Sequence, residues 1–117
     1  MSSTPAATVR EYYELVDAGR YDTLVELFAT DVRYERPGQD VIEGQDSLRQ
    51  FYFDERPLDD GSHTLHDVVV NDETVAVRGQ FTGIQNGESV SFEFADFHEF
   101  ADGKIHRRYT FTDRDEV

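Results

Sequence analysis

The segment VSFEFADFHEFADGKIHRRYTFTD, residues 90–113, is the most informative part of this chain. Its first half alternates residue by residue, which is typical of a strand with one buried face. The parity that carries the apolar side chains also carries a carboxylate at Asp96 and an imidazole at His98. Asp102-Gly103 is a strong signal for a two-residue turn, so residues 104–113 are expected to form the second strand of a hairpin. The pattern predicts a hairpin whose apolar face is polar in the middle.

The turn also predicts which side chains meet across the hairpin. A turn of two residues sets the pairing register, so we expect His98 opposite Arg107 and Asp96 opposite Tyr109. A longer turn would shift these pairs. In the expected register, one face carries Phe94, Asp96, His98, Phe100, Ile105, Arg107, Tyr109 and Phe111.

This mixed face predicts a pocket wall. An ionised pair buried in an ordinary core is costly, whereas a ligand cavity is commonly lined by aromatic side chains with a few convergent polar groups. We therefore predict that Asp96 and His98 line a cavity. A structural interpretation stays open beside this one: Asp96 bonds the Tyr109 hydroxyl or pairs with Arg107, and His98 is a partly buried, hydrogen-bonded histidine.

Helical patterns come first in the chain and strand-like patterns follow, which indicates an α+β fold in a single domain over residues 1–117. Thr4-Pro5 and Gly19 suit the start and the end of a first helix with an apolar stripe at i, i+3, i+4 and i+7. A second helix is expected to be capped by Asp22, with Leu24, Leu27 and Phe28 on its buried face, and a third helix is expected over residues 45–53, capped by Asp46 or Ser47. A loop is expected over residues 55–62. The expected strands are a short one within residues 31–38 and longer ones over residues 63–70, 74–84 and 90–100.

The composition excludes several classes of function. There is no cysteine, so neither disulfides nor thiolate metal sites are expected, and the four histidines lack the spacing of a zinc site. The net charge is -14, with Lys104 as the one lysine, which argues against nucleic acid and anionic membranes as partners. Scattered acids with scarce lysine favour a halophilic protein in a salty cytosol. No apolar run reaches the length of a membrane span and no signal peptide is visible, so a cytoplasmic location is expected.

Three segments in this order resemble the nuclear transport factor 2-like superfamily, which includes SnoaL-like polyketide cyclases and ketosteroid isomerases. They are REYYELVDAGRYDTLVELFATDVRYERPG, IEGQDSLRQFY and DFHEFADGKIHRRY. The resemblance covers nearly the whole chain. It implies a cone-shaped, curved antiparallel sheet wrapped around N-terminal helices (a cystatin-like or SnoaL-like α+β barrel), a deep pocket between them, and often a homodimer. The fold alone does not define the chemistry.

The resemblance also suggests site residues. In ketosteroid isomerases, a tyrosine on the first helix and a strand aspartic acid donate to the developing enolate oxygen, and Tyr12 and Asp96 stand at matching places. The general base of those enzymes precedes the proline of a DP-G motif, where this chain has Arg36, which cannot abstract a proton at neutral pH. That departure counts against ketosteroid isomerase activity. Asp96 with His98 resembles the aspartate and histidine of SnoaL-like cyclases, without a secure match by position.

Two functions stay open. The first is a cofactor-free isomerase or cyclase for a small hydrophobic carbonyl compound, with Asp96 as acid or base, His98 as its partner and Tyr12 as donor to the oxyanion. The second is a non-catalytic binding protein for a small apolar or carboxylated metabolite.

The expected ligand-binding residues are Arg36, Arg107, Tyr109 and Phe94. Arg36 either faces the pocket mouth or pairs on the surface with Glu35 or Asp40. Apolar Phe97 on the outer sheet face suits a homodimer contact.

Overall fold

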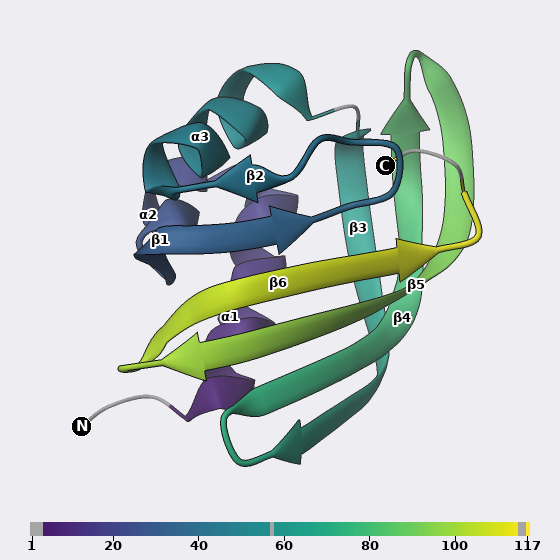
Figure 1. Ribbon diagram of the computed structural model, residues 1–117. Coiled ribbons are helices and arrows are strands. Elements are labelled where there is room, and N and C mark those ends of the chain that lie inside the picture. The colour runs from purple at the N-terminus through teal and green to yellow at the C-terminus, as the bar shows by residue number, and fades with distance from the viewer. Residues whose placement is uncertain (1–3, 57, 115–116) are drawn as a thin grey trace.

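The computed structural model describes residues 4–56, 58–114 and 117, and it shows a curved sheet that wraps around helices (Figure 1). The helices are α1 (Pro5–Ala18), α2 (Tyr21–Val25) and α3 (Gln45–Gln50), which runs on into the π-helical segment η1 (Phe51–Glu55). The strands are β1 (Phe28–Glu35), β2 (Ile42–Glu43), β3 (Leu58–Asn71), β4 (Thr74–Gln85), β5 (Glu88–Ala101) and β6 (Lys104–Thr112). The α+β fold class expected from the sequence is confirmed.

The six strands form one sheet in the order β2-β1-β6-β5-β4-β3, and its two edges do not pair with each other. The sheet is therefore curved but not closed into a barrel (Figure 1). Neighbouring strands are antiparallel except β1 and β6, which run parallel. The long strands β3 to β6 curl around α1, so the concave face of the sheet and the buried stripe of α1 enclose the interior.

The first helix begins and ends where the sequence predicts. Thr4 Oγ1 accepts a hydrogen bond from the Ala7 backbone N–H, and Pro5 occupies the first turn. Gly19 ends α1 in the left-handed conformation at φ 72°, which glycine adopts without a side-chain clash. The buried side of α1 includes the predicted stripe, so Tyr12 and Tyr13 point toward the sheet.

Several expected boundaries are wrong. Asp22 does not cap α2 but pairs with Arg49, and no side chain of residues 46 and 47 caps α3, which follows Gly44. Phe28 begins strand β1 instead of lying on a helix face. Residues 58–62 belong to β3, although the sequence suggested a loop, because they pair with the far end of β4. Tertiary pairing outweighs local propensity at each of these positions.

The β5–β6 hairpin contains a bulge that changes the predicted register. Asp102 and Gly103 form the turn, with φ 53° and 78°, and the two pairs nearest the turn are as predicted. His106 is then an extra residue in β6, so Glu99 pairs with Arg107. Beyond this point every pair differs from the prediction, because one extra residue turns the following side chains to the other face.

The observed facing pairs are His98 with Arg108 and Asp96 with Thr110. The predicted pairs of His98 with Arg107 and of Asp96 with Tyr109 are wrong. Arg108 is buried while Phe111 is 57% exposed, so the alternation of β6 after the bulge is the reverse of the expected one. The bulge therefore decides which side chains of β6 enter the interior.

Candidate functional site

A small cavity of about 30 Å³ lies between the concave face of the sheet and the helices. This volume holds about two water molecules and is far below the 300–1,000 Å³ that is typical of ligand pockets, so the interior is closed in this conformation. The cavity is lined by Tyr12, Tyr34, Arg36, Arg56, Leu58, His63, Phe81, Phe92, Phe94, Asp96, Arg108, Thr110 and Val117.

Asp96 is the centre of a buried hydrogen-bond network. Its side chain accepts from the Tyr13 hydroxyl at 2.5 Å and Arg108 Nη2 at 2.8 Å on Oδ2, and from Thr110 Oγ1 at 2.7 Å on Oδ1. Since the Thr110 proton points at Asp96, the Tyr34 hydroxyl donates to Thr110 Oγ1 at 2.7 Å. Asp96 is 2% exposed, so its carboxylate is removed from water. The three donors compensate for this desolvation.

His98 is held in one tautomer. Arg108 Nε donates to His98 Nε2 at 3.0 Å, so that nitrogen is the acceptor, and Nδ1–H donates to the Val75 carbonyl oxygen at 3.1 Å. The side chain is fully buried. Burial, together with the adjacent Arg108 guanidinium, lowers the pKa of His98 to about 3. His98 is therefore neutral across the physiological range.

The charges of Asp96 and Arg108 stabilise each other. Burial alone would raise the pKa of Asp96, but Arg108, His98 and the Tyr13 and Thr110 hydroxyls outweigh it and lower that pKa. Burial alone would likewise lower the pKa of Arg108, but Asp96 raises it well above its usual value. Both groups are ionised at neutral pH.

The tyrosine hydroxyls around this pair stay protonated. Burial raises the pKa of Tyr12 well above its usual value, and it does the same for Tyr13, where the neighbouring Asp96 adds to the effect. The Tyr12 hydroxyl bonds the Tyr52 hydroxyl, and the Tyr12 ring lies 4.3 Å from the Arg108 guanidinium carbon. Tyr12 thus lines the cavity as predicted, while its hydroxyl has a protein partner.

Arg36 faces the interior rather than a surface acid. Its Nη1 donates to the Tyr34 hydroxyl at 2.6 Å, and its Nη2 donates to the Val117 carbonyl oxygen. Its Nε and that of Arg56 are the two buried side-chain nitrogens of the described residues that have no hydrogen-bond partner. Both arginines line the same cavity. Two residues of the cavity wall therefore each carry a buried N–H donor that has no partner among the described residues.

Asp17 and His63 form a second polar pair at this cavity. His63 Nδ1 lies 2.6 Å from Asp17 Oδ1, and the His63 backbone N–H donates to Asp17 Oδ2 at 2.9 Å. The His63 ring packs against Phe81 at a centroid distance of 5.0 Å and lies in the cavity wall. Two elements far apart in the sequence, α1 and β3, therefore bring this pair together.

A known sequence family accounts for this architecture. The SnoaL-like domain matches residues 9–108, which is most of the chain. The chain belongs to the SnoaL-like domain family. The resemblance inferred from the sequence is thereby confirmed, while no curated protein sequence matches this SnoaL-like domain significantly.

Solved structures of the same fold are numerous. An NTF2-like protein of unknown function from Burkholderia pseudomallei has a TM-score of 0.85 at 20% identity, with 95% of this chain and 92% of the other covered. An LEH-like epoxide hydrolase from M. tuberculosis has a TM-score of 0.82 at 17% identity, with coverage of 93% and 82%. SalBIII, an epoxide hydrolase/cyclase-like enzyme of pyran ring formation in salinomycin, has a TM-score of 0.81 at 23% identity, with coverage of 92% and 89%. At these identities the similarity shows the fold alone.

The predicted site residues of this SnoaL-like domain divide into two groups. Tyr12, Arg36, Phe94 and Asp96 line the cavity, and His98 lies behind Arg108 in the same network. Arg107 and Tyr109, predicted to bind ligand, do not line it, because the bulge at His106 turns them to the other face. The functional roles of the first group stay predictions.

Sequence reasoning missed Arg108, Thr110, Arg56, His63 and Asp17. Arg108 and Thr110 are each one register step from a predicted residue, so the alternative register would have found them. Asp17 lies four residues after Tyr13 and therefore on the same side of α1, which was a usable signal. Nothing in the sequence indicates that His63, from a segment that is distant along the chain, would meet Asp17.

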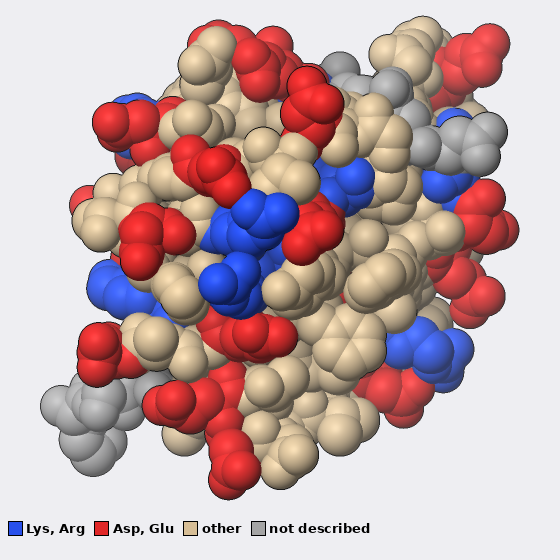
Figure 2. All heavy atoms as spheres, in the orientation of Figure 1, with Lys and Arg blue, Asp and Glu red and all other residues tan. Residues whose placement is uncertain are grey.

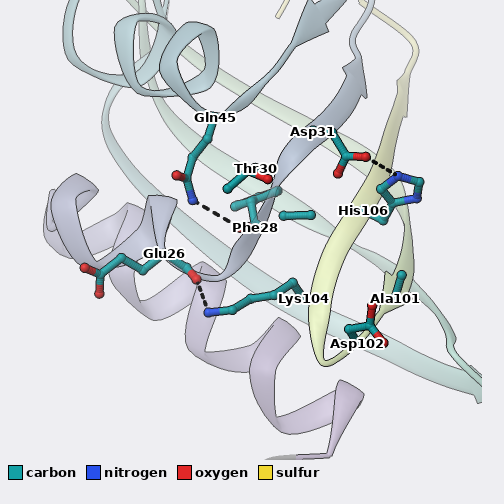
Figure 3. A pocket seen from close by; sticks show the side chains of 10 residues that line it. Glu26, Phe28, Thr30, Asp31, Gln45, Ala101, Asp102, Lys104 and His106 are labelled. Atoms are coloured by element: carbon teal, nitrogen blue, oxygen red, sulfur yellow. Dashed lines mark hydrogen bonds and ion pairs between the residues drawn. The ribbon is translucent and has the colours of Figure 1, made fainter.

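A larger hollow of about 630 Å³ opens on the surface of the SnoaL-like domain, away from this network (Figure 3). It forms where β1 and β6 lose register between the pairs Phe28–Ile105 and Arg33–Arg107. Two of its polar side chains already bind the protein backbone: Gln45 Nε2 donates to the carbonyl oxygens of residues 25 and 28, and Lys104 Nζ donates to the carbonyl oxygen of residue 26. We therefore place the candidate site at the interior cavity. None of the described helices is long and apolar enough to cross a membrane.

Proposed function

We propose that this SnoaL-like domain binds a small organic anion, such as a carboxylate, in the interior cavity. The observation that supports this most strongly is the pair of buried N–H donors at Arg36 Nε and Arg56 Nε, which have no partner among the described residues. A buried donor without a partner costs about 1–3 kcal/mol, and more when the group is charged. A ligand oxygen would relieve that cost, and the planar guanidinium group suits a carboxylate.

The charge balance around the cavity supports the same proposal. Among the described side chains that line it, three are guanidinium groups, those of Arg36, Arg56 and Arg108, and one is a carboxylate, that of Asp96. His98 is neutral and adds no charge. The cavity wall is therefore net positive within a chain of net charge -14. The remaining walls are mostly aromatic, which favours an apolar body on the ligand.

The geometry favours the binding hypothesis over acid–base catalysis by Asp96 and His98. Asp96 already accepts three hydrogen bonds and has a lowered pKa, which makes it a weak base. Both ring nitrogens of His98 have partners, so neither can accept a proton without breaking a bond. A carboxylated ligand, the alternative from the sequence, thus has the stronger support.

Val117 closes the proposed site. Its side chain is buried in the cavity wall, its N–H donates to the Pro37 carbonyl oxygen at 3.2 Å, and its own carbonyl oxygen accepts from Arg36 Nη2. A ligand larger than about two water molecules has to displace it. We propose that the ligand carboxylate replaces the Val117 carbonyl oxygen on Arg36. Val117→Gly should then bind the ligand more tightly than the wild-type protein.

Calorimetric titration with matched ligands tests the proposal. Benzoate and propanoate should bind at least tenfold more tightly than benzamide and propanamide, because only the acids pair with a guanidinium group. Arg36→Lys keeps the charge but loses Nε, and we expect about 10- to 100-fold weaker binding, the effect of one hydrogen bond to a charged group. Arg33→Lys, a half-buried position in the preceding strand β1 with salt bridges to Glu35 and Glu43, is the matched control. Equal binding of acids and amides would overturn the proposal.

We further propose that the domain, residues 1–117, works as a homodimer in a salt-rich cytoplasm. Phe97 and Phe111 are 41% and 57% exposed on the outer face of β5 and β6 and contact each other edge to face at 5.9 Å. Figure 2 shows an uncharged patch over part of these strands, with both acidic and basic groups at its edges. A second copy would cover these rings and add no like charge at the centre of the contact. Light scattering at 2 M KCl should report a dimer, and Phe111→Glu should report a monomer.

A further inference from the structure

We infer that His63 is an acid–base residue of the interior cavity, that Asp17 positions it, and that the domain transfers a proton on the anion it binds. This inference rests on the proposed function, because the reacting molecule is the ligand held by Arg36 and Arg56. The chemical class of the substrate is a small oxo acid, with a C–H bond next to a carbonyl group and a carboxylate for the arginines.

The contacts of His63 hold it in one orientation. Asp17 accepts from the backbone N–H and from Nδ1 of the same residue, so both carboxylate oxygens bind one histidine. A carboxylate at 2.6 Å places the proton on Nδ1, which leaves Nε2 with its lone pair free. No described residue bonds Nε2. This contrasts with His98, where both nitrogens have partners.

The packing of the ring completes this orientation. His63 stacks on Phe81 at 5.0 Å and meets the edge of Phe94 at 5.4 Å, while the Tyr13 ring lies 5.2 Å away on the side of α1. Its side chain is 10% exposed, which limits the access of water. Among the described residues, Asp17 is the charged group that bonds the ring. A base fixed in this way needs little reorganisation when a substrate binds.

The base and the anion site share one cavity. His63, Arg36 and Arg56 all line it, and the Arg56 guanidinium carbon lies 5.9 Å from the same Phe81 ring that His63 stacks on. Removal of a proton next to a carbonyl needs a base on the carbon side and positive charge on the oxygen side. The cavity lining includes both, with the base on β3 and the arginines directly after β1 and η1.

The step balances without a cofactor. His63 Nε2 takes the proton from the carbon next to the carbonyl, the electron pair of that C–H bond forms a carbon–carbon double bond, and the carbonyl electron pair moves onto oxygen. The resulting enolate oxygen lies beside the guanidinium groups. His63 then returns a proton to the same carbon or to the other end of a conjugated system. The net reaction is exchange or isomerisation, and nothing is oxidised or reduced.

Hydrogen exchange in D₂O tests the inference with pyruvate, 2-oxobutanoate and phenylpyruvate as probes. Proton NMR should show loss of the C–H signal next to the carbonyl, faster with wild-type protein than in buffer. His63→Gln should lower this rate constant at least about 100-fold while calorimetry still shows probe binding, since general base catalysis contributes about 10²–10⁴-fold. His66→Gln, an exposed position on the same strand, is the matched control and should leave the rate unchanged.

Asp17 needs a readout that a purely structural role would not move. Nitrogen-15 NMR of the wild-type protein should show His63 in the Nδ1–H tautomer, and Asp17→Asn should shift the tautomer ratio and lower the exchange rate about tenfold or more. An Nε2–H tautomer in the wild-type protein would overturn the inference whether or not the variants fold. Binding of the probes without exchange above buffer would also overturn it and leave the proposed function intact. Absence of binding by all three probes would overturn both.

Discussion

The neutral state of His98 should make the stability of this fold depend on pH between 7.5 and 5. In the unfolded chain a histidine has a pKa of about 6.5, whereas in the folded chain the pKa of His98 is lowered to about 3. Between these two values the unfolded chain binds a proton that the folded chain does not bind. The free energy of unfolding contributed by His98 is therefore fully present above pH 6.5 and is lost as the pH falls toward 3.

The magnitude follows from the size of this difference. Each pH unit below the unfolded pKa costs about 1.36 kcal/mol, so at pH 5 the loss is about 2 kcal/mol. His98 is fully buried, so solvent screening does not reduce this figure. Asp96 also has a lowered pKa, but its contribution is lost only as the pH falls from the usual range of carboxyl titration through that lowered pKa. Between pH 5 and 7.5 the contribution of His98 is therefore separated from that of Asp96.

Urea unfolding of the wild-type protein and of His98→Gln is the assay, at pH 7.5, 6.5 and 5.0 in the same concentration of KCl. Glutamine keeps a carbonyl oxygen as acceptor for Arg108 Nε but has no titrating group, and the other histidines are common to both proteins. Between pH 7.5 and 5.0 the wild-type protein should lose about 2 kcal/mol more than the variant. Parallel pH profiles, within about 0.5 kcal/mol, would refute the assignment of a neutral, buried His98.

Three other predictions follow from the packing and the charge. Asp96→Ala should cost about 3–5 kcal/mol in chemical denaturation, because it leaves the Arg108 guanidinium buried without its counter-ion, and a loss below about 1 kcal/mol would contradict a buried pair. Gly79→Ala should lower the melting temperature by the equivalent of about 1–3 kcal/mol. The reason is that an added Cβ would lie 2.3 Å from the Thr64 carbonyl oxygen and 2.9 Å from Phe94 Cζ. An unchanged melting temperature would show that β3 and β4 are further apart. Raising KCl from 0.1 to 2 M should raise the melting temperature and speed association of an anionic ligand, since salt screens the net charge of -14, and salt-independent rates would contradict this electrostatic barrier.

Local signals were sufficient for the first helix and the last turn but not for the site. Thr4-Pro5 and Gly19 define α1 because the caps of a helix are satisfied within a few residues. Asp102-Gly103 defines a hairpin because both residues tolerate positive φ. The meeting of Asp17 with His63 depends instead on how α1 lies across a curved sheet, and no short-range pattern encodes that geometry.

The bulge at His106 shows why counting from a turn fails a few residues away from it. Turn chemistry determines the pairs next to the turn, but β6 also pairs with β1, and the Ile105 N–H donates to the Leu27 carbonyl oxygen at 2.9 Å just before the bulge. The strand therefore satisfies two neighbours whose spacings differ, and an extra residue absorbs the difference.

Hydrophobic burial alone would select the register without the bulge, because that register buries both Tyr109 and Phe111. The observed register leaves Phe111 57% exposed, which forgoes part of the roughly 1.5–3 kcal/mol available from burying such a side chain. It places Thr110 opposite Asp96, where a hydroxyl close to the backbone reaches the carboxylate at 2.7 Å. A tyrosine at that place would carry its hydroxyl past the carboxylate, at the far end of its ring. Since an uncompensated buried carboxylate costs several kcal/mol, the hydrogen-bond requirement of Asp96 outweighs the apolar pattern of the strand opposite it.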